Sequence, residues 1–174
     1  MRLFLSCKIP DKISSYLREV TKQLPKASLT IPRQFDLTMK FFGEVSESLT
    51  AELDQHLSLL NFPPFEATLE KINVFSEKKT HTVWVGLSPK EAFFSLHRAV
   101  EKALFPLAPH DDRFVPHITL ARVKSVPNKK EFLQSLSEIS IDPQIFRVEE
   151  LVLFQSKIQQ EGAIHSSLFT YQLQ

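Results

Sequence analysis

The sequence has only three glycines in 174 residues, at Gly43, Gly86 and Gly162. A phosphate loop built from glycines needs several of them at fixed spacing. Neither G-x-G-x-x-G nor G-x-x-x-x-G-K-[ST] occurs in the chain. The sequence therefore argues against a Rossmann or P-loop nucleotide site.

Cysteine and long apolar runs are also scarce. Cys7 is the only cysteine, which excludes an intrachain disulfide and a cysteine-rich metal site. No apolar run reaches the roughly 18 residues that a membrane-spanning helix needs. The apolar start of the chain is interrupted by Lys8 and Pro10 before it reaches the length of a signal-peptide core. We therefore expect a cytoplasmic protein without a membrane segment.

Charge of either sign is nearly balanced, with 21 Lys and Arg against 20 Asp and Glu, for a formal net charge of +1. A protein that grips a long nucleic-acid backbone without sequence preference carries a basic stripe and a high pI, which this balance does not favour. Recognition of one or two phosphates remains compatible with it. The length suits one domain or two small lobes that share a core.

Hydrophobic periodicity predicts an alternation of strands and helices. Helices are expected from Asp11 to about Leu24, over 47–60, after an N-cap at Ser88, and after Asn128. Strands are expected over residues 2–9, 35–42, 65–75, 80–87, 114–123, 145–154 and 163–173. The order β-α-β-α-β thus occurs twice and is followed by one more strand, which indicates a weak internal duplication.

The middle strands of the two repeats carry D-L-T-M at 36–39 and H-I-T-L at 117–120, an offset of 81 residues (117 − 36). We predict an α+β fold in which residues 1–174 form one bilobal domain with pseudo-repeats of about 1–78 and 79–174. Two lobes related by a pseudo-twofold axis, each an antiparallel sheet backed by two helices, would flank a central active-site cleft.

Residues two apart on a strand point to the same face, so His117 projects with Thr119, and Asp36 projects with Thr38 and Lys40. In-line displacement at phosphorus requires a base, an acid on the leaving-group side, and hydrogen-bond donors to the nonbridging oxygens. Two His-x-Thr strands that face each other supply all of these without a metal ion. The pattern therefore favours phosphodiester cleavage.

Longer motifs carry a resemblance to a known family. The segments T-M-K-F-F-G-E-V at 38–45 and P-H-I-T-L-A-R-V at 116–123, with M-R-L-F at 1–4, V-W-V-G at 83–86, Ser156 and Gly162, resemble the motifs of the RNA 2′,3′-cyclic phosphodiesterases. These enzymes were formerly called 2′-5′ RNA ligases and belong to the two-histidine (2H) phosphoesterase superfamily. The resemblance spans essentially the whole chain.

The resemblance implies hydrolysis of a terminal 2′,3′-cyclic phosphate on RNA, or of a cyclic nucleotide, to a 2′-phosphate. We expect no cofactor and no metal ligands, because no Cys, His or carboxylate cluster at ligand spacing accompanies His117, and we expect a monomer. His117 would be the base, Asp36 stands where the family has its proton-donor His, and Thr38 and Thr119 would hold phosphoryl oxygens. Arg122 resembles the family's phosphate-binding Arg. Strand alternation places Arg122 on the face opposite His117, so it reaches the site only if the strand bulges after Leu120.

Asp36 is the one departure from the first motif. An unperturbed Asp has a pKa of about 3.9 and is ionised at neutral pH. To donate a proton it would need a pKa raised by roughly three units, and Lys40 on the same face would oppose that shift. Asp36 is therefore either a surrogate acid or a disabled position.

Two other function classes stay open: a catalytically silent module that binds RNA ends or nucleotide phosphates, and a structural domain without a ligand. Lys40 is predicted to bind phosphate because its strand parity is right. His165 has no supporting spacing, and His110-Asp111-Asp112 is expected to form a solvated turn rather than a metal site.

Overall fold

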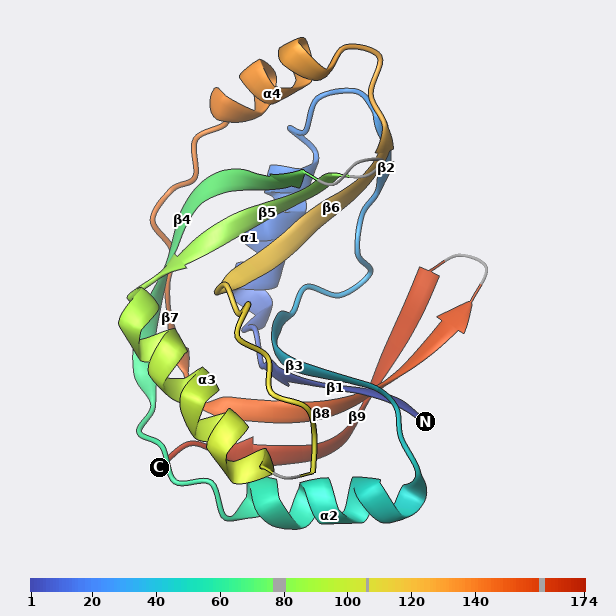
Figure 1. The fold of residues 1–174 in the computed structure, drawn as a ribbon. Coiled ribbons are helices and arrows are strands. Elements are labelled where there is room, and N and C mark those ends of the chain that lie inside the picture. The colour runs from blue at the N-terminus through green and yellow to red at the C-terminus, as the bar shows by residue number, and fades with distance from the viewer. Residues whose placement is uncertain (77–80, 106, 160–161) are drawn as a thin grey trace.

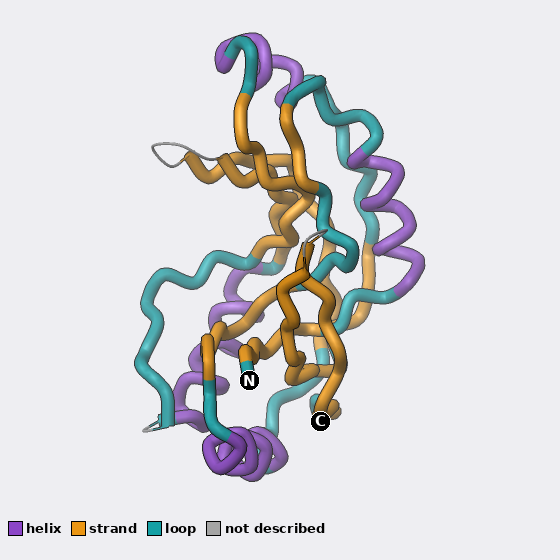
Figure 2. Tube along the Cα trace, turned by 90° about the vertical axis from the view of Figure 1, so that its right-hand side faces the viewer, coloured by secondary structure: helices purple, strands orange, loops and turns teal. Residues whose placement is uncertain are grey.

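The computed structural model describes residues 1–76, 81–105, 107–159 and 162–174. Two sheets and the helices that cover them form two lobes, seen in two orthogonal views in Figures 1 and 2. The elements in chain order are β1 (Arg2–Cys7), α1 (Asp11–Thr21), β2 (Ser28–Thr30), β3 (Leu37–Glu44), α2 (Glu47–Ser58), β4 (Phe65–Ser76), β5 (His81–Ser88), α3 (Lys90–Leu104), β6 (His117–Ser125), α4 (Lys129–Ser137), β7 (Ile145–Val148), β8 (Glu150–Gln159) and β9 (Gly162–Gln172).

The two sheets have related strand orders. Sheet A runs β3-β1-β8-β9 and sheet B runs β2-β6-β5-β4-β7, and the strand pairs are antiparallel. If β1 is matched with β5 and β3 with β6, as the sequence repeat predicts, then β8 of sheet A matches β4 of sheet B. The predicted α+β class and the twofold relation of two antiparallel sheets are confirmed.

The matched strands also reveal an exchange between the two halves of the chain. β4 belongs to the first half of the sequence but pairs in sheet B, and β8 belongs to the second half but pairs in sheet A. With β9 in sheet A and β2 in sheet B as well, each sheet contains two strands from the other half, and the pseudo-repeats of about 1–78 and 79–174 do not each form a lobe.

The helices follow the same relation. α2 contacts β9 of sheet A and α4 contacts β4 of sheet B, at opposite ends of the molecule (Figure 1). α1 contacts the motif strand β6, and α3 contacts β5 and the motif strand β3. In the described ranges, no helix is long and apolar enough to cross a membrane.

A single large core packs the inner faces of both sheets. The predicted apolar face of the first strand is buried through Leu3, Leu5, Cys7 and Ile9. The opposite face of the same sheet carries a separate small cluster of Phe4, Val152 and Phe154. This second cluster gives sheet A an aromatic floor on the side away from the main core.

Of two predicted helix N-caps, one is confirmed and one is wrong. The Asn128 side chain caps α4 by accepting hydrogen bonds from the N–H groups of Lys130 and Glu131, as predicted. The predicted N-cap at Ser88 is wrong, because Ser88 is the last residue of β5, paired with Thr68, and Pro89 takes the cap position.

Two boundaries near the predicted strands also differ. The single strand expected over 145–154 is broken before Glu150, since β7 pairs in sheet B and β8 in sheet A. β2 was not predicted, because three residues are too few to show an alternation. Gly43, just beyond the strand expected over 35–42, lies inside β3 with a φ of 73°, a backbone conformation that glycine adopts readily.

Candidate active site

Both motif strands contain a one-residue bulge at equivalent positions. In β3, Ser6 of β1 is opposite Thr38 and Leu5 is opposite Lys40, so Met39 is the extra residue. In β6, Val83 and Trp84 of β5 are opposite Ala121 and Thr119, so Leu120 is extra. The two extra residues are 81 positions apart, which is the offset of the sequence repeat (120 − 39).

Each bulge reverses the alternation of side chains beyond it. Leu120 and Ala121 are both buried, and Arg122 then shares the face of His117 and Thr119. The bulge that Arg122 needs in order to reach the site is therefore present. In β3 the same reversal turns Lys40 inward and brings Phe41 to the face of Thr38.

A cavity of about 460 Å³ lies between the two motif strands. It brings together five of the six residues that the sequence singled out: Asp36, Thr38, His117, Thr119 and Arg122. The remaining lining residues are Arg2, Phe4, Thr30, Ile31, Pro32, Arg33, Gln34, Phe41, Ser156, Ile158, Ala163 and His165.

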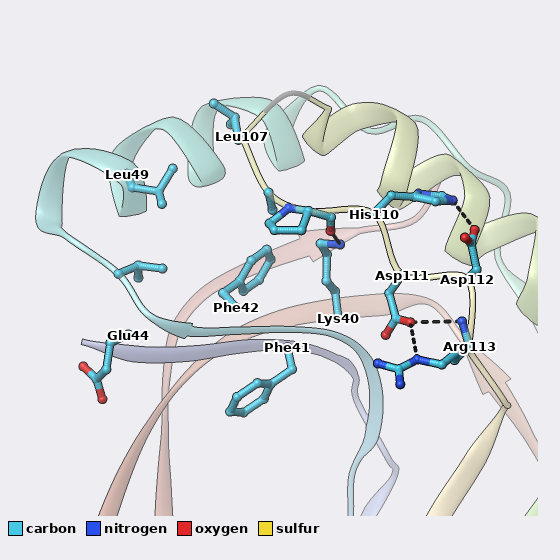
Figure 3. Close-up of a pocket in the computed structure, with 13 residues that line it drawn as sticks. Lys40, Phe41, Phe42, Glu44, Leu49, Leu107, His110, Asp111, Asp112 and Arg113 are labelled. Carbon is cyan, nitrogen blue, oxygen red and sulfur yellow. Dashed lines mark hydrogen bonds and ion pairs between the residues drawn. The ribbon is translucent and has the colours of Figure 1, made fainter.

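Lys40 is the predicted residue that the structure places elsewhere. Its side chain is 4% exposed, and its Nζ donates to Glu101 Oε1 at 2.5 Å and to the carbonyl oxygen of Pro109 at 2.7 Å. It lies beside a different pocket, shown in Figure 3 with Asp111 and Arg113. The structure thus corrects the prediction that Lys40 binds phosphate: strand parity failed because Met39 is bulged.

Glu101, the partner of Lys40, also contacts the His110-Asp111-Asp112 turn, which the sequence predicted to be solvated. His110 Nδ1 lies 2.8 Å from Glu101 Oε2, and His110 Nε2 lies 2.7 Å from Asp112 Oδ1. The turn is therefore tied to the buried Glu101 rather than merely solvated. Together these contacts anchor the loop that leads from α3 to β6.

His117 is held in one orientation by its surroundings. Its Nδ1 donates to the carbonyl oxygen of Val115 at 2.7 Å, because a carbonyl can only accept. The rings of Phe75 and Trp84 contact it edge to face, with centroid distances of 5.2 and 5.7 Å. Burial lowers the pKa of His117, and the bond to Val115 opposes this only in part. The ring is thus neutral near pH 7 with a free lone pair on Nε2.

Asp36 lies directly before β3 and lines the same cavity. Burial raises the pKa of its carboxyl to about 6, and the positive charge of Arg122 opposes this rise. The sequence suggested that Lys40 would oppose the rise in the pKa of Asp36. In the structure the cation that opposes it is Arg122. Oδ1 is buried and has no hydrogen-bond partner in the described part of the chain. Asp36 is thus a carboxyl that can hold a proton close to neutral pH.

The two threonines are half-buried on matching positions of β3 and β6. For Thr38 and Thr119 alike, the hydroxyl group has no hydrogen-bond partner within residues 1–76, 81–105, 107–159 and 162–174. Both hydroxyls are therefore available to a ligand in the cavity.

Sequence reasoning missed several lining residues, among them Arg2, Phe4, Arg33 and His165. The ring of His165 meets Phe4 edge to face with centroids 4.8 Å apart, and burial lowers the pKa of His165. Arg2 and Phe4 belong to the M-R-L-F motif that carried the resemblance, which was the available signal. His165 and Arg33 had none, because only the strand pairing of β9 and the loop before β3 bring them to the cavity.

Metal ligands were not predicted from the sequence. In the described residues, no three His, Cys, Asp or Glu side chains gather as they would around a metal ion. The chemistry available to the cavity rests on Asp36, His117, the threonine hydroxyls and the arginines.

A sequence profile described as the 2′-5′ RNA ligase superfamily matches residues 9–158. The chain belongs to this superfamily. The resemblance to the RNA 2′,3′-cyclic phosphodiesterases, which the motifs predicted, is thereby confirmed.

Superfamily relatives include proteins named RNA 2′,3′-cyclic phosphodiesterase. The one from Thermus thermophilus is 30% identical and matches over 99% of this chain and 90% of its own length. The one from Thermotoga maritima is 27% identical and matches over 100% of this chain and 96% of its own.

Solved structures of other proteins share the fold. TT0787 of Thermus thermophilus aligns with a TM-score of 0.80 at 24% identity, covering 99% of this chain and 98% of its own. E. coli LigT, in a complex with 3′-AMP, aligns with a TM-score of 0.79 at 22% identity, covering 99% and 97%. At this identity the agreement concerns the fold.

Proposed function

We propose that this protein hydrolyses the 2′,3′-cyclic phosphate at an RNA end to a 2′-phosphate. The observation that carries the proposal is one shared cavity, in which a neutral, oriented His117 and a carboxyl of raised pKa, Asp36, lie with two threonine hydroxyls that bond to no described residue. The relatives named RNA 2′,3′-cyclic phosphodiesterase support the same chemistry.

The base in this proposal is His117. Water attacks phosphorus, and its proton passes to Nε2 of His117, whose Nδ1 already donates to Val115. The pentacoordinate centre breaks its bond to O3′ on the opposite side. The product is a 2′-phosphate and a free 3′-hydroxyl, so one water is consumed.

The acid is Asp36. The departing O3′ takes a proton from its carboxyl, which the resting enzyme then recovers from His117 through solvent. With a pKa of about 6, half of the Asp36 side chains are protonated at pH 6. At pH 7 roughly a tenth remain protonated. Asp36 thus acts as a surrogate for the family's proton-donor histidine, at a cost in rate at neutral pH.

The negative charge on the phosphoryl oxygens is stabilised by Thr38, Thr119 and Arg122. Hydroxyl and guanidinium donors aimed at the nonbridging oxygens stabilise charge that grows in the transition state. Because Thr38 and Thr119 occupy matching positions on two strands, their hydroxyls approach the phosphate from both lobes. We propose that the reaction needs no metal ion, and that the protein acts as a monomer in the cytoplasm.

The deciding experiment is an assay on a nucleoside 2′,3′-cyclic phosphate, with product identification and with and without a chelator. The expected result is a 2′-phosphate product formed at a rate that the chelator leaves unchanged. A 3′-phosphate product would contradict the assigned leaving group. A large loss with chelator that one divalent ion restores would reveal a metal site.

A silent binding module is the second candidate, and Asp36 itself favours it, since most of its carboxyls are ionised at pH 7. In that case the cavity would bind phosphate ends without turnover at any pH. Binding of a nucleoside 2′-phosphate with no turnover between pH 5 and 8 would select this alternative.

A further inference from the structure

The bulged strands place Phe41 of β3 and Arg122 of β6 at equivalent positions, 81 residues apart (122 − 41). The second motif therefore supplies a guanidinium at this position, whereas the first supplies an aromatic ring. The ring is 54% exposed and lines the cavity. The neighbouring strand β1 supplies a guanidinium at this place, because the guanidinium carbon of Arg2 lies 5.0 Å from the centroid of the Phe41 ring.

Arg2 is held in place without being neutralised. A cation over an aromatic face is attracted by the ring's quadrupole but keeps its full charge and its N–H donors. In the part of the chain that the structure describes, Arg2 has no ion pair with a carboxylate. Its guanidinium is therefore positioned for an anion that comes from outside the protein.

The charges of the cavity exceed what one cyclic phosphate needs. Its described lining contains a single carboxylate, Asp36, but carries Arg122 on β6 and Arg2 on β1, although the chain as a whole has a net charge of only +1. A cyclic phosphodiester carries one negative charge, which Arg122 and the two threonines can hold. Arg2, on the side of sheet A, is not needed for that charge and points to a second phosphate.

We propose that Arg2, supported by Phe41, binds the internucleotide phosphate that precedes the terminal nucleotide. The protein then recognises the end of an RNA chain in preference to a cyclic mononucleotide. This inference rests on the proposed function for the chemistry of the chain end, while the role of Arg2 concerns the next phosphate along the chain.

The kinetic test compares a nucleoside 2′,3′-cyclic phosphate with a dinucleotide that ends in the same cyclic phosphate. Arg2→Gln should lower kcat/KM for the dinucleotide by about five- to tenfold, between the effects of an exposed ion pair and of a buried charged hydrogen bond. Its kcat/KM for the mononucleotide should change little. Arg2→Lys should recover part of the loss.

Two controls separate binding from a general effect on structure. Arg98→Gln removes the same charge from an exposed position on α3 that does not line the cavity, so the ratio of the two substrates should stay at the wild-type value. A dinucleotide with a neutral methylphosphonate linkage, tested on the unaltered protein, should lose the advantage that Arg2→Gln removes.

A binding test keeps the inference independent of turnover. Calorimetry would compare a dinucleotide ending in a 2′-phosphate with a nucleoside 2′-phosphate, in wild type and Arg2→Gln. The variant should lose the preference for the dinucleotide. The slope of log affinity against log salt should become shallower by about 0.7, as expected for one lost contact to a single strand.

The outcomes distinguish this inference from the proposed function. A dinucleotide preference that survives Arg2→Gln in both tests overturns the role of Arg2, even if the protein turns over. A preference that Arg2→Gln removes in binding, together with no turnover by wild type, overturns the hydrolytic function and leaves Arg2 in its role. If wild type binds neither ligand, the inference fails outright.

Discussion

The Nδ1–H group of His117 donates to the carbonyl oxygen of Val115, only two residues earlier in the chain, at 2.7 Å. This bond fixes the tautomer of the ring, so Nε2 is the atom left to accept a proton. A His117→Ala variant should lose roughly 10²–10⁴-fold in kcat, the usual contribution of a general base. Substrate affinity, measured by calorimetry, should change much less, since the proton moves in the transition state.

The stability of His117→Ala is the control for that loss. A variant that is inactive because it is unfolded would show a reduced melting temperature and lost circular dichroism. Full activity in a folded His117→Ala protein would remove the base from the mechanism.

The pH–rate profile should place the optimum below pH 7. His117 has a pKa below its ordinary value, so it is deprotonated and active as a base already in mildly acidic solution. Asp36 loses its proton around pH 6, so the rate should fall on the alkaline side. Steady-state kinetics from pH 4.5 to 8.5 would check this. A rate that still rises between pH 7 and 8 would contradict Asp36 as the acid.

Asp36→His should raise kcat at pH 7 and move the optimum upward. The imidazolium ordinarily titrates at a pKa of about 6.5, close to the pH at which the acid must work. KM should respond less than kcat, because only the protonated acid assists departure of O3′. Absence of turnover at every pH, in both wild type and the Asp36→His variant, would replace the enzyme with the binding module.

Asp36→Asn should stabilise the protein at neutral pH. The folded-state pKa of about 6 exceeds the ordinary value of 3.8, so ionising Asp36 costs free energy in the folded state. Wild-type stability should fall as pH rises from 4 to 6 and then level off. The Asn variant lacks this cost, so its advantage of about 1–3 kcal/mol should be present above pH 6 and absent below pH 4. Urea unfolding at pH 4 and pH 7.5 would measure it.

Thr38→Val and Thr119→Val should each weaken binding of inorganic phosphate or a nucleoside 2′-phosphate. Valine keeps the shape and strand propensity but lacks the hydroxyl donor, whose loss should cost about 1.5–3 kcal/mol for a hydrogen bond to a charged group. Unfolding midpoints should stay near the wild-type value, since neither hydroxyl bonds to a described residue. If both folded variants bind phosphate as tightly as wild type, the threonine hydroxyls do not contribute to phosphate binding.

Lys40→Met should act on stability and not on ligand binding. Removing Lys40 leaves the buried Glu101 carboxylate without its lysine cation and with only histidine rings beside it, at a cost of about 3–5 kcal/mol. The double variant Lys40→Met/Glu101→Gln should recover much of that loss. Phosphate affinity in the folded fraction should equal that of wild type, which is the outcome that distinguishes this lysine from Arg122.

The sequence was sufficient for most of the elements, for the two antiparallel sheets and for the two motif strands that flank one cavity, because hydrophobic periodicity and the 81-residue offset can be read from the residues alone. It failed where a single residue changes the phase of a strand. Met39 and Leu120 look like ordinary strand residues, so alternation placed Lys40 in the cleft and left Arg122 in doubt. Nothing in the local pattern distinguishes a bulged residue from a regular one.

Contacts between distant segments were also beyond the sequence. Arg2 approaches Phe41 only because β1 and β3 are paired, and His165 reaches the cavity only because β9 extends sheet A. The rise in the pKa of Asp36 depends on burial by residues far along the chain, which composition cannot supply.

The exchange of β4 and β8 between the sheets affects how the chain folds during its synthesis. Sheet A needs β8, which begins at Glu150, before it can join β1 and β3 to β9. A ribosome that has released only the first half of the chain has therefore released no complete lobe. Such long-range pairing slows folding and delays it until nearly the whole chain is available. Sheet B needs no residue beyond Val148, so the strand that carries His117 can lie in a finished sheet before β8 and β9 complete the sheet that carries Thr38.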